Sequence, residues 1–191
     1  MKKALLILDL DETLIHASAK KLERDEKANV FDYFIYERPN LKEFLVSVSQ
    51  NFELAIWSSA GDEYVDEVIK ETVIGDFDYS FVWGRSRAVY RRNYELDENR
   101  ISDVYRDHYQ YVKPLTKVKR LGYRLERILI VDDTPHKSRL NYGNAIYPSP
   151  YEGKLEDDEL IHLANYLNMI KEIENFRKIE KRNWRSKVRE K

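Results

Sequence analysis

The chain has 191 residues, of which 42% are hydrophobic and 35% are charged, and this composition predicts a folded domain with a real core and argues against disorder. It contains no cysteine, which excludes disulfides, a thiolate nucleophile and a cysteine-ligated metal. The N-terminal apolar run is too short for a signal peptide or a membrane span, so we expect a cytoplasmic protein without membrane association.

The first predicted element is a strand over residues 3–10 that ends in acidic residues. Its nearly uninterrupted apolar run is typical of a strand buried on both faces of a parallel sheet. Asp9, Asp11 and Thr13 lie at its end, where open α/β sheets bind ligands. The alternative interpretation is a helix N-cap with an acidic first turn.

Strands and helical segments alternate along the rest of the chain, which favours a parallel sheet of βαβ units. The apolar spacing distinguishes the helices from the strands. The predicted elements are a polar flap or loop (17–29), a strand (31–36), a helix (40–49), a strand (54–57), a helix (62–72), strands (127–131 and 145–147) and a long C-terminal helix from residue 157 toward 184.

The segment from Phe77 to Tyr111 breaks this alternation. It is rich in Tyr and Arg, and a connection of this length without a role is unusual, so we interpret it as an insertion beside the active site. Arg85 and Arg87 within it are candidates for binding a second substrate phosphate. The alternatives are an ordinary long connection and a solvated loop.

Polar residues follow three of the predicted buried strands, and the strand ends of a doubly wound sheet converge in one crevice. A lysine from a nearby loop joins them. The candidate residues are Asp9, Asp11 and Thr13 after the first strand, Ser58 and Ser59 after the second, Asp132 and Asp133 after the third, and Lys113.

This inventory suits phosphoryl transfer. A carboxylate can attack phosphorus and form an aspartyl-phosphate, and a second carboxyl group can protonate the leaving oxygen and later deprotonate water. A hydroxyl and an ammonium group can bind the phosphoryl oxygens. Each pair of carboxylates at about 4 Å costs roughly 4 kcal/mol at an effective dielectric constant of about 20, so four of them together predict a divalent cation such as Mg²⁺.

Five segments resemble the FCP/SCP branch of the haloacid dehalogenase (HAD) phosphatases, the NLI-interacting-factor-like enzymes that dephosphorylate the C-terminal repeat of RNA polymerase II and related proteins. The first is Asp-Leu-Asp-Glu-Thr-Leu-Ile-His at residues 9–16. The resemblance runs from about residue 3 to about residue 167. The other four segments are Arg-Pro followed by Glu-Phe-Leu (38–45), Ile-Trp-Ser-Ser-Ala (56–60), Tyr-Val-Lys-Pro-Leu (111–115) and Ile-Leu-Ile-Val-Asp-Asp-Thr-Pro (128–135).

The resemblance implies a Rossmann-like HAD fold without a separate cap and an Mg²⁺-dependent phosphatase that acts through phosphoaspartate. It makes Asp9 the nucleophile and a metal ligand. Asp11 becomes the acid and base, with its backbone carbonyl on the metal, and Thr13 holds Asp11 in place. Ser58 and Lys113 would bind phosphoryl oxygens.

The same resemblance makes Asp133 a ligand of Mg²⁺, while Asp132 would ligate it through water or orient Lys113. Asp133 stands where the family usually has Asn, and Ser58 where Thr is commoner. Ser59 is a further candidate for substrate binding, although its hydroxyl can instead bond to the backbone.

An open site without a cap suits a large substrate, so a phosphorylated protein or peptide bearing Ser, Thr or Tyr phosphate is expected first. The alternatives are a nucleotide or polynucleotide end, a small phosphorylated metabolite, and a non-catalytic peptide-binding module.

Residues 171–191, with nine Lys or Arg against four Asp or Glu, are predicted as a basic helical extension of a phosphatase domain over residues 1–170. This extension is either a solvated helix face or a surface for nucleic acid. We expect a monomer or a weak dimer.

Overall fold

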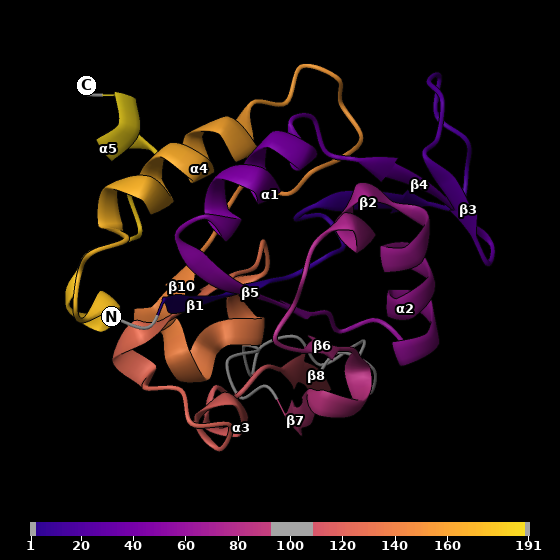
Figure 1. Cartoon of the computed structure of the whole chain (residues 1–191). Helices are drawn as coiled ribbons and strands as arrows, with labels where there is room; N and C mark the ends of the chain where they lie inside the picture. Colours follow the sequence, from indigo (N-terminus) through magenta and orange to yellow (C-terminus); the bar gives the residue numbers. More distant parts are fainter. Residues whose placement is uncertain (1–2, 93–108, 190–191) are drawn as a thin grey trace, which may run out of the picture.

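The computed structural model describes residues 3–92 and 109–189. Its centre is a sheet of five parallel strands in the order β10-β9-β1-β5-β6, with helices on both faces (Figure 1). The predicted α/β class is therefore confirmed. The strands are β1 (Ala4–Leu8), β5 (Phe52–Trp57), β6 (Val82–Trp83), β9 (Ile128–Val131) and β10 (Ala145–Ile146).

The apolar run of β1 is explained by a core on each side of the sheet. Leu6 and Leu8 belong to a cluster with residues of the helices α1, α2 and α4, whereas Leu5 and Ile7 pack with Val118 of α3 on the opposite face. Figure 1 shows α1 and α4 side by side over the first face. The helices are α1 (Leu41–Ser49), α2 (Asp62–Glu71), α3 (Thr116–Lys119) and α4 (Glu159–Ile170).

The register of the sheet brings three strand ends together. β1 lies between β5 and β9, and Leu8 is paired with Ile56 on one side and with Val131 on the other. Because all three strands run in the same direction, the residues that follow them lie at one edge of the sheet. The predicted convergence of the polar residues after these strands thus follows from the strand order.

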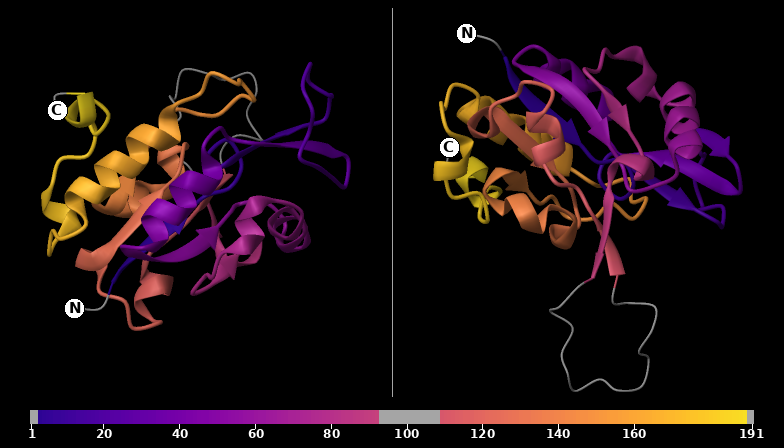
Figure 2. Two further views of the ribbon diagram at one scale, coloured as in Figure 1. Left: turned by 45° about the horizontal axis from the view of Figure 1, so that its top comes forward. Right: turned by 90° about the horizontal axis from the view of Figure 1, so that it is seen from below.

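A small antiparallel sheet follows β1 and extends beside α2 (Figures 1 and 2). The prediction of a flap or loop over residues 17–29 is wrong at both ends, because strand residues occur there. In the order β2-β4-β3, these strands are β2 (Ile15–Ser18), β4 (Tyr33–Glu37) and β3 (Ala28–Val30). The strands β2 and β3 are too short for a recognisable pattern, whereas the strand predicted over residues 31–36 is confirmed as β4.

The segment predicted as an insertion divides into two parts. Its first part supplies β6, which extends the central sheet, and Trp83 of this strand packs edge-on against Trp57 at a centroid distance of 5.0 Å. Its second part contains an antiparallel hairpin of β7 (Val89–Arg92) and β8 (Tyr109–Val112). Residues 93–108 lie outside the described part of the chain.

Short 3-10 helices connect several of these elements. One of them, η4, follows β9 directly and lies beside β8 and the site described below. They are η1 (Val73–Asp76), η2 (Arg85–Arg87), η3 (Leu125–Arg127), η4 (Pro135–Asn144) and η5 (Phe176–Lys178). The element η4 consists of two short helices joined across a kink at Asn141.

The prediction of a long C-terminal helix is wrong. Helix α4 ends at Ile170, and the chain folds back through η5 to the short helix α5 (Ser186–Arg189). The physical reason is the burial of Phe176 and Trp184, which a straight helix would carry away from the core. The described part of the tail, residues 171–189, therefore folds back onto the domain and is not a single extended helix.

We expect Trp184→Ala to lower the free energy of unfolding by about 3–5 kcal/mol, the cost of truncating a buried Trp. The indole packs 5.8 Å from the ring of Tyr166, and its Nε1 donates to the carbonyl of Tyr147 at 3.0 Å. Urea denaturation measures the change, with Tyr142→Ala as the control because Tyr142 is 78% exposed. Equal stability of the two variants would contradict the structural role of the tail.

No helix within residues 3–92 and 109–189 is long and apolar enough to cross a membrane. The longest of these helices, α4, has 12 residues, whereas a bilayer requires roughly 20. A cytoplasmic location stays a prediction.

Candidate active site

The chain turns sharply directly after β1. The amides of Thr13 and Leu14 both donate to the carbonyl of Leu10, at 3.1 and 2.8 Å. Glu12 has a φ of 59°, a left-handed conformation that is uncommon for a residue with a side chain, and its amide donates to the carbonyl of Ile15 at 2.8 Å. These hydrogen bonds fix the backbone that carries Asp9 and Asp11.

A buried arginine ties this turn to a distant loop. Arg38 is 1% exposed, and its Nη1 donates to the carbonyl of Thr13 at 3.0 Å. Its Nε and Nη2 form a two-pronged ion pair with Asp157, each at 2.8 Å, and Nη2 also donates to the carbonyl of Ser149. The planar guanidinium matches the two oxygens of the partly buried Asp157 carboxylate, so Arg38 is a rigid support for the turn.

Three carboxylates form a compact cluster at the end of the sheet. One oxygen from each of Asp9, Asp132 and Asp133 lies within 4.8 Å of the others, and Asp9 and Asp132 are buried. Lys113, which is fully buried, donates from Nζ to Asp9 at 2.7 Å and to Asp132 at 2.6 Å. The structure thus brings together four of the predicted site residues.

A second lysine, which is not among the predicted site residues, reaches the same cluster. Lys137 on η4 places Nζ 2.9 Å from Asp9, 3.6 Å from Asp132 and 3.8 Å from Asp133. The signal that was available is its spacing: it lies four residues after Asp133, within one turn of the predicted acidic pair.

The two buried carboxylates at the centre have opposite pKa shifts. Burial by itself would raise the pKa of Asp9, but the ammonium groups of Lys113 and Lys137 outweigh it and hold the pKa below its usual range. Burial, followed by the charge of Asp9, raises the pKa of Asp132 to about 6, although both lysines oppose this shift. Asp9 is therefore the group that stays ionised.

The side chain of Asp11 lies outside this cluster and contacts different partners. Tyr64 donates its hydroxyl to Oδ1 at 2.8 Å, and Ser58 donates to Oδ2 at 3.2 Å. Burial raises the pKa of Asp11, the charge of Asp9 adds to the shift, and these two hydrogen bonds only partly oppose it. A carboxyl group with a raised pKa is suited to donate a proton. Tyr64 was predicted only as part of a helix and was missed as a site residue.

The hydroxyl groups at the site have different surroundings. Thr13 accepts from the amide of Asp133 at 3.2 Å and so links two strand ends. Ser58 also accepts from the amide of Ala60 at 3.0 Å. The hydroxyl of Ser59 is buried and makes no hydrogen bond within the described residues, which contradicts its interpretation as a backbone-bonding group.

The two predicted arginines take different positions. Arg85 donates from Nε to the carbonyl of Ser59 at 2.9 Å, and its guanidinium lies 5.4 Å from the ring centroid of Tyr111. The guanidinium of Arg87 lies 5.5 Å from the ring centroid of Trp83. Arg85 therefore borders the loop after β5, while Arg87 packs on the edge strand β6.

The donor set fits a small divalent cation. Asp9, Asp132 and Asp133 offer carboxylate oxygens, which Mg²⁺ prefers, and with the ammonium groups of Lys113 and Lys137 the five groups still carry a net negative charge when all are ionised. The carboxylate of Asp11 is not part of this set, so its predicted metal contact rests on its backbone carbonyl alone.

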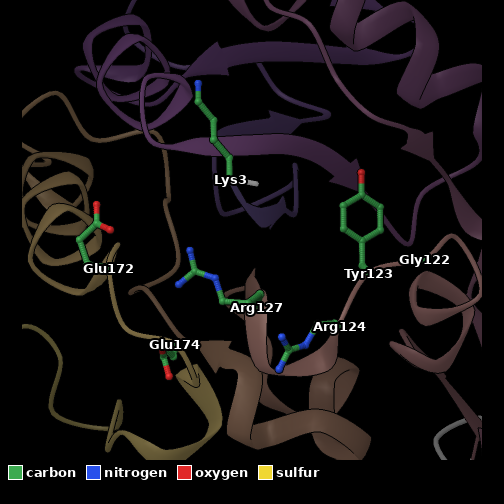
Figure 3. Close-up of a pocket in the computed structure, with 7 residues that line it drawn as sticks. All are labelled: Lys3, Gly122, Tyr123, Arg124, Arg127, Glu172 and Glu174. Atoms are coloured by element: carbon green, nitrogen blue, oxygen red, sulfur yellow. The ribbon is translucent and has the colours of Figure 1, made fainter. Parts of the chain in front are cut away.

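A separate pocket of about 340 Å³ lies at the opposite, amino end of the strands (Figure 3). Its position follows from Lys3, which precedes β1, and from Arg127, which precedes β9. Arg127 donates to the carbonyls of Lys171 and Ile173, so it secures the chain after α4. The lining mixes both charges and consists of Lys3, Gly122, Tyr123, Arg124, Arg127, Glu172 and Glu174.

Comparisons with known proteins match nearly the whole chain. The family model described as NLI interacting factor-like phosphatase matches residues 4–177. Nuclear envelope morphology protein 1 of Saccharomyces cerevisiae is 28% identical over 190 residues, which cover 89% of this chain and 40% of that protein. The human carboxy-terminal domain RNA polymerase II polypeptide A small phosphatase 1 is 25% identical over 181 residues, which cover 91% of this chain and 61% of that protein.

A solved structure shares the fold. The fission yeast RNA polymerase II CTD phosphatase bound to beryllium fluoride superposes with a TM-score of 0.54 at 20% identity, covering 86% of this chain and 46% of that chain. The chain thus spans less than two thirds of the length of each of these three proteins.

Proposed function

The chain belongs to the NLI interacting factor-like phosphatases, a family of phosphoric monoester hydrolases with a HAD fold, and we propose that it hydrolyses phosphate monoesters through an aspartyl-phosphate on Asp9. The main support for this proposal is that the pKa values of two neighbouring carboxyl groups are shifted in opposite directions. The pKa of Asp9 is lowered beside two lysines, while that of Asp11 is raised by burial. Pairs of titratable groups whose environments separate their pKa values are typical of an acid and a nucleophile.

In the first step, the ionised carboxylate of Asp9 attacks phosphorus, and the bond from phosphorus to the ester oxygen breaks. Asp11 gives its proton to that leaving oxygen. In the second step, the Asp11 carboxylate takes a proton from water, the water oxygen attacks phosphorus, and the bond to Asp9 breaks. Inorganic phosphate leaves, and both carboxyl groups return to their starting states.

Other residues hold the reacting groups. Lys113 touches both Asp9 and Asp132, so its ammonium is placed to neutralise a phosphoryl group on Asp9. Ser58 and Tyr64 orient Asp11. When Mg²⁺ is bound, it would be held by Asp9, Asp132 and Asp133 and would supply positive charge for the phosphoryl oxygens.

A phosphorylated protein is the substrate class that we favour. The human relative is named as a small phosphatase for the carboxy-terminal domain of RNA polymerase II, and the chain aligns with 61% of it. At the rim of the site, Arg85 beside the half-buried Tyr111 and the 56% exposed Tyr90 offer a basic and aromatic surface to a peptide.

The basic tail gives little support to a nucleic-acid substrate. Arg185 is paired with Asp158, Arg182 is paired with Glu180, and the ammonium of Lys181 is turned inward onto backbone carbonyls. These contacts occupy cations that a phosphate backbone would need.

The test is a phosphosubstrate panel of Ser, Thr and Tyr phosphopeptides, nucleotides, end-phosphorylated oligonucleotides and an aryl phosphate, assayed with Mg²⁺ and with EDTA. We expect turnover of the aryl phosphate with Mg²⁺, its loss with EDTA, and the highest kcat/KM for phosphopeptides. No turnover of any substrate with Mg²⁺ would refute the proposal. A preference for oligonucleotides would support the proposed phosphatase mechanism, but it would make a polynucleotide end the substrate in place of a phosphoprotein.

We expect Arg85→Ala to raise KM for the preferred phosphopeptide about tenfold without changing kcat, because a contact at the rim contributes equally to binding the substrate and the transition state. Steady-state kinetics check this result. Arg87→Ala is the matched control, since Arg87 packs on Trp83, and its KM is expected to stay within about twofold of wild type. A rise in KM for the small aryl phosphate in Arg85→Ala would show that the residue acts at the phosphoryl group.

A further inference from the structure

Each carboxylate oxygen of Asp9 is held by a different lysine. Oδ1 accepts from Lys113 at 2.7 Å, and Oδ2 accepts from Lys137 at 2.9 Å. In this arrangement, neither oxygen can bind a metal ion or attack phosphorus without losing or sharing an ammonium partner. An oxygen has two lone pairs and can accept a second partner, but sharing would hold an ammonium group and a metal ion against the same oxygen, where the two positive charges repel each other. We therefore expect one of the two lysines to move away when a metal ion binds Asp9.

Lys113 is the less mobile of the two lysines. Its side chain is fully buried and bridges Asp9 and Asp132, so removing it from this position would leave a buried ammonium without a partner. Its backbone amide also donates to the carbonyl of Lys137 at 2.8 Å. Lys113 thus belongs to the fixed framework of the site.

The ammonium group of Lys137 lies where a metal ion could replace it. Its Nζ lies within 4.0 Å of an oxygen of all three carboxylates, Asp9, Asp132 and Asp133, which are the same three that can hold a metal ion. Its side chain is 17% exposed and has a flexible four-carbon stem, so the ammonium has a path to solvent that Lys113 does not have.

We propose that Lys137 is a built-in counter-cation of this carboxylate cluster and that Mg²⁺ binds in competition with its ammonium. This inference depends on the proposed function, which identifies the three carboxylates as the Mg²⁺ site. Two cations on one set of oxygens repel each other, so Lys137 leaves Asp9 as the metal ion binds. Because the ammonium is tethered to the cluster, it lowers the apparent affinity for Mg²⁺ and stabilises the protein when the ion is absent.

The test is titration of Mg²⁺ by calorimetry into wild type, Lys137→Met and Lys137→Arg. Met keeps the length of the side chain without its charge, and Arg keeps the charge. We expect Lys137→Met to bind Mg²⁺ about tenfold more tightly than wild type, within the range of typical coupling effects, and Lys137→Arg to bind it much less tightly than Lys137→Met. Lys119→Met, at an exposed lysine on α3, is the matched control and is expected to bind Mg²⁺ as wild type does.

A second measurement uses the wild-type protein and does not depend on the folding of a variant. Amine acetylation, followed by mass spectrometry with and without Mg²⁺, reports how free each lysine is. We expect the labelling of Lys137 to rise with Mg²⁺ while that of Lys119 stays constant. Unchanged or lower labelling of Lys137 would overturn the inference.

The two proposals can fail separately. If Lys137→Met binds Mg²⁺ no more tightly than the wild-type protein does, Lys137 is not a counter-cation that competes with the metal ion. This conclusion holds even if the wild-type protein turns over an aryl phosphate. Tighter Mg²⁺ binding by Lys137→Met supports the inference, even if the substrate panel finds no turnover. Absence of Mg²⁺ binding in wild type and in Lys137→Met overturns the inference as well.

Discussion

Asp9→Asn is expected to abolish turnover of every phosphomonoester, because the neutral amide cannot attack phosphorus to form the acyl phosphate. The fold should survive this change. Lys113 retains Asp132 at 2.6 Å, and Lys137 retains Asp132 and Asp133, so neither ammonium is left without a carboxylate. We expect a loss in the free energy of unfolding of about 1–3 kcal/mol, the usual cost of removing one partner from buried hydrogen bonds.

Single-turnover assays and thermal unfolding measure the two effects on the same preparation. Asp66→Asn makes the same chemical change at an exposed position on α2 and should retain wild-type turnover and stability. Measurable turnover by Asp9→Asn that does not arise from contaminating wild type would refute the aspartyl-phosphate mechanism. A folded, inactive Asp9→Asn protein that still binds phosphopeptide would support it.

The sequence was sufficient to predict the central sheet and most of the site because both depend on local signals. The apolar runs of β1, β5 and β9 are buried between two helical layers, and such runs are recognisable without knowledge of the packing. The polar residues directly after these strands were predicted to converge, and Asp9, Ser58 and Asp132 do lie at one edge of the sheet.

The missed features depend on contacts between distant parts of the chain. Tyr64 has the spacing of an ordinary helical residue, and only the placement of α2 beside the turn after β1 brings its hydroxyl to Asp11. Lys137 is close to the acids in the sequence, but its direction depends on η4. The end of α4 at Ile170 is set by the burial of Trp184, a tertiary effect that helical spacing cannot reveal.

Asp11→Asn is expected to slow turnover by about 10²–10⁴-fold for alkyl phosphates, the usual contribution of a positioned general acid. The amide oxygen of Asn can accept from one of the two hydroxyl groups of Tyr64 and Ser58, and its NH₂ group can donate to the oxygen of the other, so the position of the side chain should be retained. The amide cannot protonate the leaving oxygen. An aryl phosphate with a good leaving group needs no such proton. Its first step should therefore remain fast, while hydrolysis of the aspartyl-phosphate, which requires Asp11 as base, becomes slow.

The expected signature is a burst of about one equivalent of phenol per active site, followed by slow steady-state release. The pH profile gives a second readout. Because burial raises the pKa of Asp11, the free enzyme loses activity as pH rises through that pKa, and this basic limb of kcat/KM should disappear in Asp11→Asn. Equal slowing of aryl and alkyl phosphates without a burst would mean that the Asp11 side chain does not transfer the proton to the leaving oxygen. A burst with the basic limb removed would assign both proton transfers to this carboxyl group.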